Sequence, residues 1–123
     1  PEECDAVEEM AKNRLQRAST ADGKGGAQIS ENRKAWQAGI RPAWNKEAEG
    51  DLVAQLSRRV YDYVNYVLGL NIQEHGQEPL MSIQYFGHGY NDTSPDRYTP
   101  HCDGPCDGEP FLDGTRMATM VIY

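Results

Sequence analysis

The stretch "NKEAEGDLVAQLSRRVYDYVNYVLGL" (residues 45–70) predicts the longest helix of the chain. Gly69 is expected to stop this helix, because glycine commonly follows the last helical turn. The tyrosines of the stretch are interpreted as packing residues rather than as a cofactor site. Seven apolar residues recur at helical spacing and are expected to pack on a core: Leu52, Val53, Leu56, Val60, Tyr63, Val64 and Val67.

The residues before this helix predict a second helix and a turn. Residues 2–17 begin with acidic side chains, which the dipole of a helix favours in its first turn, and they carry a narrow apolar stripe. The glycine-rich residues 21–28 do not have the spacing of a phosphate-binding loop, so they are interpreted as a hairpin tip or a mobile loop. Residues 29–40 are expected to contain a short strand.

After Gly76 the pattern changes to short strand-like runs that are separated by turn residues. Residues 80–86 alternate in hydrophobicity, residues 97–103 are expected to be extended, and residues 115–123 predict a strand. In that last strand, alternation places Thr119, Val121 and Tyr123 on one face. Helices followed by strands indicate the α+β class, with helices that back a sheet or barrel.

Length and composition limit the number of domains and the classes of partner. Its 123 residues allow one domain, and its net charge of −7 argues against nucleic acid or an anionic membrane as the main partner. No apolar run approaches the roughly 20 residues that a membrane span needs. Because the apolar run "MATMVIY" (residues 117–123) reaches the last residue, we expect the chain to be part of a longer protein. The compartment stays open between the endoplasmic reticulum lumen and the cytoplasm.

The stretch "YTPHCDGPCDGE" (residues 98–109) holds the candidate chemistry. In an extended chain, His101 and Asp103 project to the same face and could supply two ligands to a divalent metal. Alone, this pair is also typical of a surface turn. Cys102 and Cys106 are interpreted as loop thiols or a local disulfide, because their spacing does not match that of a zinc site.

The ordered motifs of residues 78–104, "EPLMSIQYFGHGYNDTSPDRYTPHCDG", and residues 114–123, "GTRMATMVIY", resemble the catalytic domain of prolyl 4-hydroxylases. These enzymes are 2-oxoglutarate- and iron(II)-dependent dioxygenases. The opening "PEECDAVEEMA" is similar to the first helix of that family, and Arg33 lies where an arginine often precedes the first core strands. The resemblance implies a partial double-stranded β-helix (a jelly roll, cupin-like) with N-terminal supporting helices, residues 1–76 forming the support and residues 77–123 the first core strands.

The resemblance also implies roles for single residues. His101 and Asp103 would be the first two iron ligands, and Tyr85 and Tyr123 would line the 2-oxoglutarate pocket, with Thr119 beside Tyr123 on the same strand face. The cofactors would be iron(II) and 2-oxoglutarate, with ascorbate as an accessory reductant. In the family the third ligand, a histidine, and the basic residue that pairs with 2-oxoglutarate come after the equivalent of Tyr123. The chain as given is therefore expected to be inactive by itself.

The expected substrate is a proline-containing peptide or protein. Residues 104–114 would join the metal-binding strand to the strand that carries Tyr123, and Asp107, Glu109 and Asp113 make this loop acidic. It is interpreted either as a lid that contacts the substrate or as a solvated connector. The alternative to an enzyme is a non-catalytic binding module that keeps a degenerate dioxygenase fold.

Overall fold

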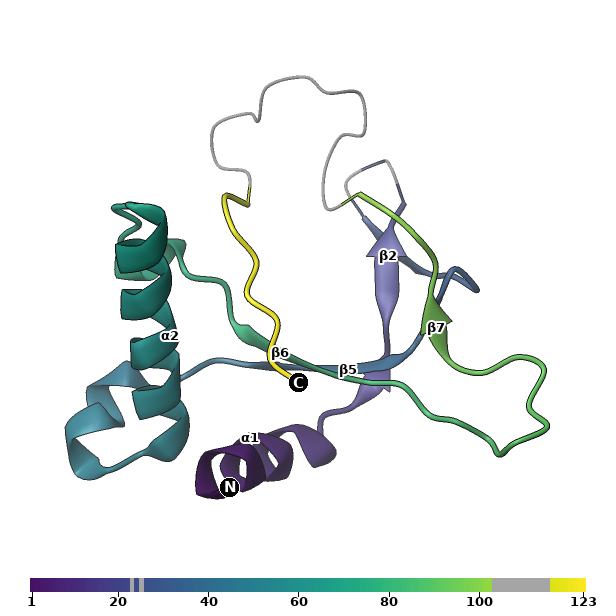
Figure 1. Ribbon diagram of the computed structural model, residues 1–123, viewed down its shortest axis with the longest axis horizontal. Coiled ribbons are helices and arrows are strands. Elements are labelled where there is room, and N and C mark those ends of the chain that lie inside the picture. The colour runs from purple at the N-terminus through teal and green to yellow at the C-terminus, as the bar shows by residue number, and fades with distance from the viewer. Residues whose placement is uncertain (23, 25, 103–115) are drawn as a thin grey trace.

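The computed structural model describes residues 1–22, 24, 26–102 and 116–123, and these form a mixed helix and sheet structure of the expected α+β class (Figure 1). The helices are α1 (Glu2–Lys12) and α2 (Leu52–Leu68), with 3-10 turns η1 (Trp44–Glu49) and η2 (Glu74–Gly76). The strands are β1 (Gln16–Arg17), β2 (Ser19–Ala21), β3 (Ala27–Ile29), β4 (Arg33–Lys34), β5 (Trp36–Ile40), β6 (Leu80–Gln84) and β7 (Arg97–Tyr98).

The described strands form three small antiparallel sheets. The largest has the order β1-β5-β6, with β5 in the middle, and the other two are the pairs β2–β3 and β4–β7. In Figure 1, α1 lies beneath the three-stranded sheet and α2 stands at one end of it, while β2 and β7 lie towards the other end. The hairpin interpretation of residues 21–28 is confirmed, since β2 and β3 pair across them.

The core lies where α1 and α2 meet the three-stranded sheet. Ala11 of α1, Ala38 and Ile40 of β5, and Val53 of α2 are buried together, at 0 or 1% exposure. Three of these four side chains are alanine or valine, and small side chains allow helix and strand backbones to approach closely. These contacts pack both helices against β5.

Helix α1 is shorter than predicted, because it ends at Lys12 instead of continuing to residue 17. Gln16 and Arg17 instead form β1, opposite Gln37 and Trp36 of β5. The backbone groups of these two residues make the hydrogen bonds of a sheet ladder and not those of a helix. The local sequence did not indicate this pairing. The prediction of a helix over the whole range was therefore wrong at its C-terminal end.

Helix α2 ends where its sequence predicts, but it begins at Leu52 and not at residue 45, because residues 44–49 form the separate turn η1 and Gly50 follows with a φ of 89°. The side chain of Asp51 accepts a hydrogen bond of 2.8 Å from the backbone N–H of Ala54, which caps the first turn. Gly69 has a φ of 60°, in the left-handed region that glycine adopts without strain. The expected packing of the apolar stripe holds only in part, because Val53 is its only buried member and Leu52, Tyr63 and Val67 are exposed.

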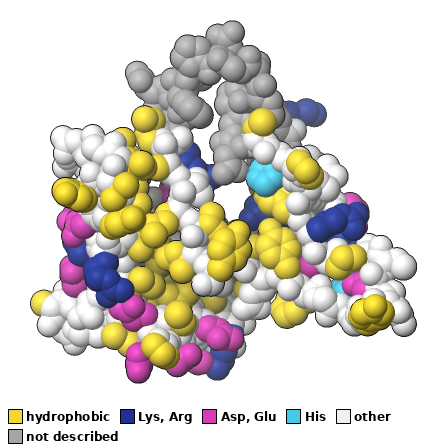
Figure 2. Space-filling view, viewed as in Figure 1, with side chains coloured by type: hydrophobic (Ala, Val, Ile, Leu, Met, Phe, Trp, Pro, Cys, Tyr) yellow, Lys and Arg dark blue, Asp and Glu magenta, His cyan; other side chains and the backbone are white. Residues whose placement is uncertain are grey.

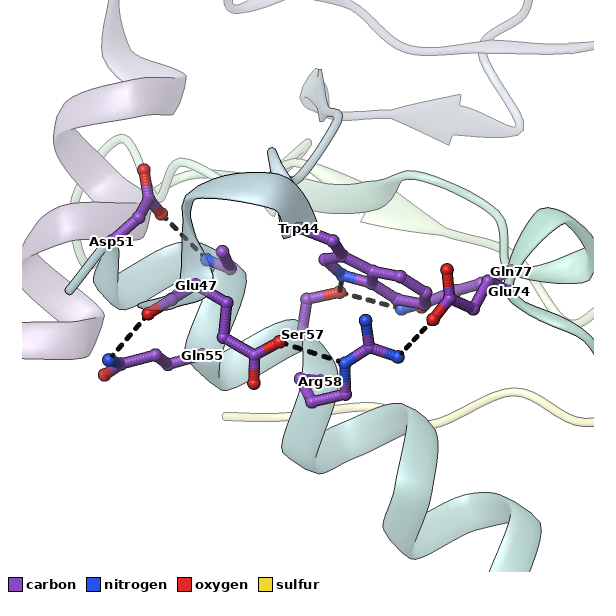
Figure 3. Close-up of polar contacts among 9 residues, drawn as sticks. Trp44, Glu47, Asp51, Gln55, Ser57, Arg58, Glu74 and Gln77 are labelled. Atoms are coloured by element: carbon purple, nitrogen blue, oxygen red, sulfur yellow. Dashed lines mark hydrogen bonds and ion pairs between the residues drawn. The ribbon is translucent and has the colours of Figure 1, made fainter. Parts of the chain in front are cut away.

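A polar network holds the two 3-10 turns against α2 (Figure 3). The hydroxyl of Ser57, which is fully buried, accepts hydrogen bonds from Trp44 Nε1 at 3.0 Å and from Gln77 Nε2 at 2.9 Å. Beside it, the guanidinium of Arg58 lies 4.0 Å from the centroid of the Trp44 ring. Arg58 also bonds Glu47 at 3.1 Å and Glu74 at 2.8 Å. One turn of α2 thus binds residues on both sides of it in the sequence.

Replacing Ser57 with alanine is expected to lower the free energy of unfolding by about 1–3 kcal/mol, because two buried N–H groups lose their acceptor. Chemical unfolding followed by circular dichroism measures this change. The matched control is Ser94→Ala, which removes only an exposed acceptor of the Lys34 ammonium and should change stability by less than about 0.5 kcal/mol. Equal effects of the two substitutions would show that the Ser57 contacts do not stabilise the fold.

Two of the expected strands are absent or shorter in the part of the chain that the structure describes. Residues 116–123 carry no strand assignment, and within 97–103 only Arg97–Tyr98 pair. A strand exists only where a partner completes its ladder, and hydrophobic alternation alone does not supply one. Residues 116–123 lie between α2 and β7 in the view of Figure 1, and residues 118–120 line a groove together with residues of α2. The prediction of a strand there was wrong for the described residues.

Candidate functional site

Tyr85 lies on an uncovered face of the sheet. In β6, Leu80 and Ser82 point towards the core, so Met81 and Ile83 point to the opposite side, where they are 50% and 41% exposed. Tyr85 follows directly and continues this alternation at 47% exposure. Figure 2 shows hydrophobic side chains gathered over the middle of the molecule in this view. The residue expected in a cofactor pocket is therefore accessible.

Two hydrogen bonds close the connection of residues 85–96 and bring the end of β6 next to the start of β7. The backbone N–H of Phe86 donates to Asp96 Oδ2 at 3.1 Å, and the N–H of Asp96 donates to the Phe86 carbonyl at 3.3 Å. The Asp96 side chain is only 5% exposed, and its other oxygen lies 3.9 Å from His88 Nε2. These contacts place Tyr85, on one strand end, close in the fold to the strand that leads to His101.

His101 lies three residues after Tyr98, just beyond the β4–β7 pair. Its ring stacks on the ring of Tyr98, with centroids 3.6 Å apart and an angle of 20° between the planes. Its Nδ1 lies 2.9 Å from the carbonyl oxygen of Thr99. A carbonyl oxygen only accepts hydrogen bonds, so Nδ1 carries the proton, and in the neutral ring Nε2 keeps its lone pair. This tautomer is the usual one of a metal-binding histidine.

The strand pairing next to His101 brings in Arg33, which the sequence had indicated only by its position. Arg33 lies opposite Tyr98 in the β4–β7 register, and its Cζ is 5.0 Å from the centre of the Tyr98 ring. The residue after Tyr98, Thr99, donates its N–H to the Asn32 carbonyl at 2.9 Å. The sequence does not indicate this role of Tyr98, because the pairing of residues 33 and 98 has no local signal.

Several of the predicted site residues lie outside the described part of the chain. These are the second expected iron ligand, Asp103, and the acidic residues of the expected loop, Asp107, Glu109 and Asp113. Cys106 also lies there, whereas Cys102 is disulfide-bonded and Cys4 is an exposed free thiol. Among the described residues, no three His, Cys, Asp or Glu side chains lie together as a metal site would require.

Thr119 and Tyr123 lie in the last described segment, in two different settings. Thr119 contributes to a groove of about 160 Å³ between this segment and α2, lined by Tyr63, Val64, Val67, Leu68, Ala118, Thr119 and Met120. This volume is below the roughly 300 Å³ at which ligand pockets begin. Tyr123 is fully exposed. The groove is apolar and therefore suits packing of the segment on α2 more than the binding of a charged ligand.

A bidentate ion pair attaches this segment to the residues before β6. Arg116 donates from Nε and from its NH2 group to the two carboxylate oxygens of Glu78, both at 2.7 Å. These hydrogen bonds hold the pKa of the Glu78 carboxyl below its usual range, although partial burial acts in the opposite direction. The pair fixes residue 116 beside residue 78, which lies 38 positions earlier.

We expect the Glu78 carboxyl to titrate below the ordinary glutamate value of about 4.3. Because the pKa is lowered in the folded state, the stabilisation is complete above the ordinary value and is lost as the pH falls through the lowered one. NMR titration of the side-chain carboxyl carbon measures this pKa. In Arg116→Gln, the midpoint should return towards the ordinary value. A midpoint that is the same in both proteins would exclude the ion pair in solution.

No helix within the described residues is long and apolar enough to cross a membrane, in agreement with the sequence.

The chain was also compared with known proteins at three levels. No protein-family model, no curated protein and no solved structure matches it.

Proposed function

We propose that the chain belongs to a 2-oxoglutarate- and iron(II)-dependent dioxygenase that hydroxylates prolyl residues in a peptide or protein. The order of its motifs supports this proposal, from Tyr85 through His101 and Asp103 to the final run that ends at Tyr123. The observation that carries it is the state of His101. The imidazole is held by a stacked ring and by a carbonyl acceptor on Nδ1, which makes Nε2 the nitrogen that would bind a metal.

The donor types fit iron(II). An imidazole nitrogen and a carboxylate are the ligands of the two-histidine, one-carboxylate sites that bind non-haem iron and leave positions open for substrates. His101 would supply the first nitrogen and Asp103 the carboxylate. The second histidine of such a site would come from residues after Tyr123 in the full-length protein. His75 and His88 are not assigned to the metal, since His88 faces Asp96 instead.

The remaining residues would bind and shield the cosubstrate. When bound, iron(II) would let O2 act as the oxidant, with one oxygen atom entering a C–H bond of proline to give C–OH and the other entering the succinate that forms, with CO2, from 2-oxoglutarate. Tyr85 would contact 2-oxoglutarate from the uncovered face of β6, beside Met81 and Ile83, whose apolar side chains exclude water. Thr119 and Tyr123 would contact it from the final segment. In the finer fold that this function needs, a double-stranded β-helix, the same face of β6 would point into the barrel.

The expected substrate is a proline-containing peptide that is neutral or basic. The chain carries a net charge of −7, and the acids Asp107, Glu109 and Asp113 follow the metal-binding motif closely in sequence. Such charges attract basic ligands and repel acidic ones. Ascorbate is the accessory reductant to include in an assay, as the resemblance to prolyl 4-hydroxylases implies.

The test is turnover of 2-oxoglutarate by the full-length protein with iron(II), ascorbate and proline-rich peptides. Formation of succinate is expected to depend on the peptide, and mass spectrometry should find one added oxygen on proline. A peptide of the same sequence with alanine in place of proline is the control. Absence of both iron binding and turnover would exclude the enzyme and favour the non-catalytic binding module, which keeps the fold without the metal chemistry.

A further inference from the structure

Three side chains from two parts of the chain, Arg33 and the segment of Tyr98 and His101, lie in sequence against one another and end at His101. The Arg33 guanidinium lies 5.0 Å from the centre of the Tyr98 ring, and that ring lies 3.6 Å from the ring of His101. Arg33 and Tyr98 are half-buried register partners of β4 and β7, whereas His101 is exposed. The exposed imidazole of His101 therefore packs on a ring that the β4–β7 pair holds in place.

Arg33 is anchored independently of His101. One of its terminal nitrogens donates to the Ser19 carbonyl of β2 at 2.9 Å. Its Nε is buried and has no hydrogen-bond partner among the described residues. A buried N–H without an acceptor costs free energy, and the negative face of an aromatic ring offsets part of this cost for a cation. The position of Arg33 over Tyr98 is thus favoured by both contacts.

Among the described residues, two contacts of different kind constrain the His101 ring. The hydrogen bond to the Thr99 carbonyl, 2.9 Å from Nδ1, selects which nitrogen carries the proton. A single hydrogen bond leaves the ring able to turn about that bond. Stacking on Tyr98, at 20° between the planes, restricts this rotation. An exposed histidine normally samples several rotamers, so the stack removes freedom that metal binding would otherwise have to remove.

We propose that Tyr98 and Arg33 are positioning residues for His101. The Tyr98 ring sets the plane of the imidazole, and Arg33 holds the Tyr98 ring against the β4–β7 pair. As a metal ligand, His101 would then already hold Nε2 in one orientation in the metal-free protein. This role for the pair rests on the proposed function, but the orientation of the His101 ring in the metal-free protein can be measured without it.

The experiment compares Tyr98→Phe, which keeps an aromatic ring, with Tyr98→Leu, which keeps only apolar bulk, in the full-length protein. Proton NMR of the metal-free protein reports the carbon-bound ring protons of His101, which are assigned by their loss in His101→Gln. Stacking should shift these protons upfield in the wild type and in Tyr98→Phe, and the shift should vanish in Tyr98→Leu. Arg33→Gln should reduce it.

The second measurement is the affinity for Co²⁺, followed by its visible absorption. Loss of the stack in Tyr98→Leu should weaken binding by about ten- to a hundredfold, as loss of supporting contacts around a metal ligand commonly does. Tyr98→Phe should bind within about threefold of the wild type on the same scale. The matched control is Tyr90→Leu, which removes a fully exposed tyrosine and should alter neither the ring protons nor the affinity.

The outcomes separate this inference from the proposed function. If Tyr98→Leu keeps the amide spectrum of a folded protein and leaves the His101 shifts and the Co²⁺ affinity unchanged, the positioning role is wrong and the metal site stands. If Tyr98→Leu does not fold, Arg33→Gln decides by the same two measurements. If the wild type binds no Co²⁺, the proposed function fails. In that case the shifts of the metal-free protein still decide whether Tyr98 orients His101.

Discussion

His101→Ala in the full-length protein is expected to reduce 2-oxoglutarate turnover to background. The substitution removes a metal ligand itself, so the loss should exceed the roughly hundredfold effect of losing a supporting residue. Asp103→Ala should behave in the same way. Turnover is measured as succinate formed in the presence of iron(II) and peptide, together with the affinity for iron(II). Both measurements should fall together, because the step that fails is the binding of metal.

The control for this prediction is His88→Ala. His88 is exposed and faces Asp96 at 3.9 Å, so its removal deletes a histidine without touching the proposed ligands. Turnover should stay close to that of the wild type. If His101→Ala keeps parent-like turnover, or if both alanine variants lose activity equally, the assignment of His101 as an iron ligand is wrong.

The largest effect on stability is expected from Ile40→Ala, at about 2–5 kcal/mol, a large part of the roughly 5–15 kcal/mol that holds a domain folded. Ile40 is fully buried among Ala11, Ala38 and Val53. Its backbone is held in the β5–β6 ladder opposite Leu80. Because small neighbours and a fixed strand cannot close over the missing atoms, a cavity should remain.

Chemical unfolding measures this difference, and Ile29→Ala is the matched control. Ile29 of β3 is 59% exposed, so the same change of side chain removes little buried surface there. Its cost should stay below about 1 kcal/mol, because surface substitutions seldom have larger effects. A cost for Ile40→Ala no greater than that for Ile29→Ala would show that the core is not centred on β5.

Elements whose signals are local could be predicted from the sequence. The end of helix α2 is the clearest case, since Gly69 marks it, whereas its start after Asp51 was not predicted. The hairpin at residues 21–28 is another, because glycines close together favour a tight turn. By contrast, β1 and the last segment depend on partners elsewhere in the chain. Gln16–Arg17 became a strand because β5 is available, and residues 116–123 are not one within the described region.

The residues of the candidate site also divide into those that a short motif indicates and those that only the fold brings together. His101 could be singled out from its spacing to Asp103 within one short motif. The role of Tyr98 could not, because it depends on the pairing of residues 33 and 98 and on a stack that only the fold creates. Arg33 was noted by position alone, and its contacts with Ser19 and Tyr98 come from two different strand pairs. Supporting residues of a site are harder to read from sequence than its ligands.

The order of strands in the main sheet also has a consequence for the rate of folding. β5 pairs with β6 across 40 to 48 residues of sequence, and with β1 across about 20, so neither pair can start as a tight hairpin. Closing such long loops costs entropy before any ladder bond repays it, and chains rich in distant contacts fold slowly, in milliseconds to seconds. Helix α2, which fills the longer connection, shortens the distance to be closed when it forms early. Its caps at Asp51 and Gly69 therefore bear on how fast the sheet assembles as well as on how stable it is.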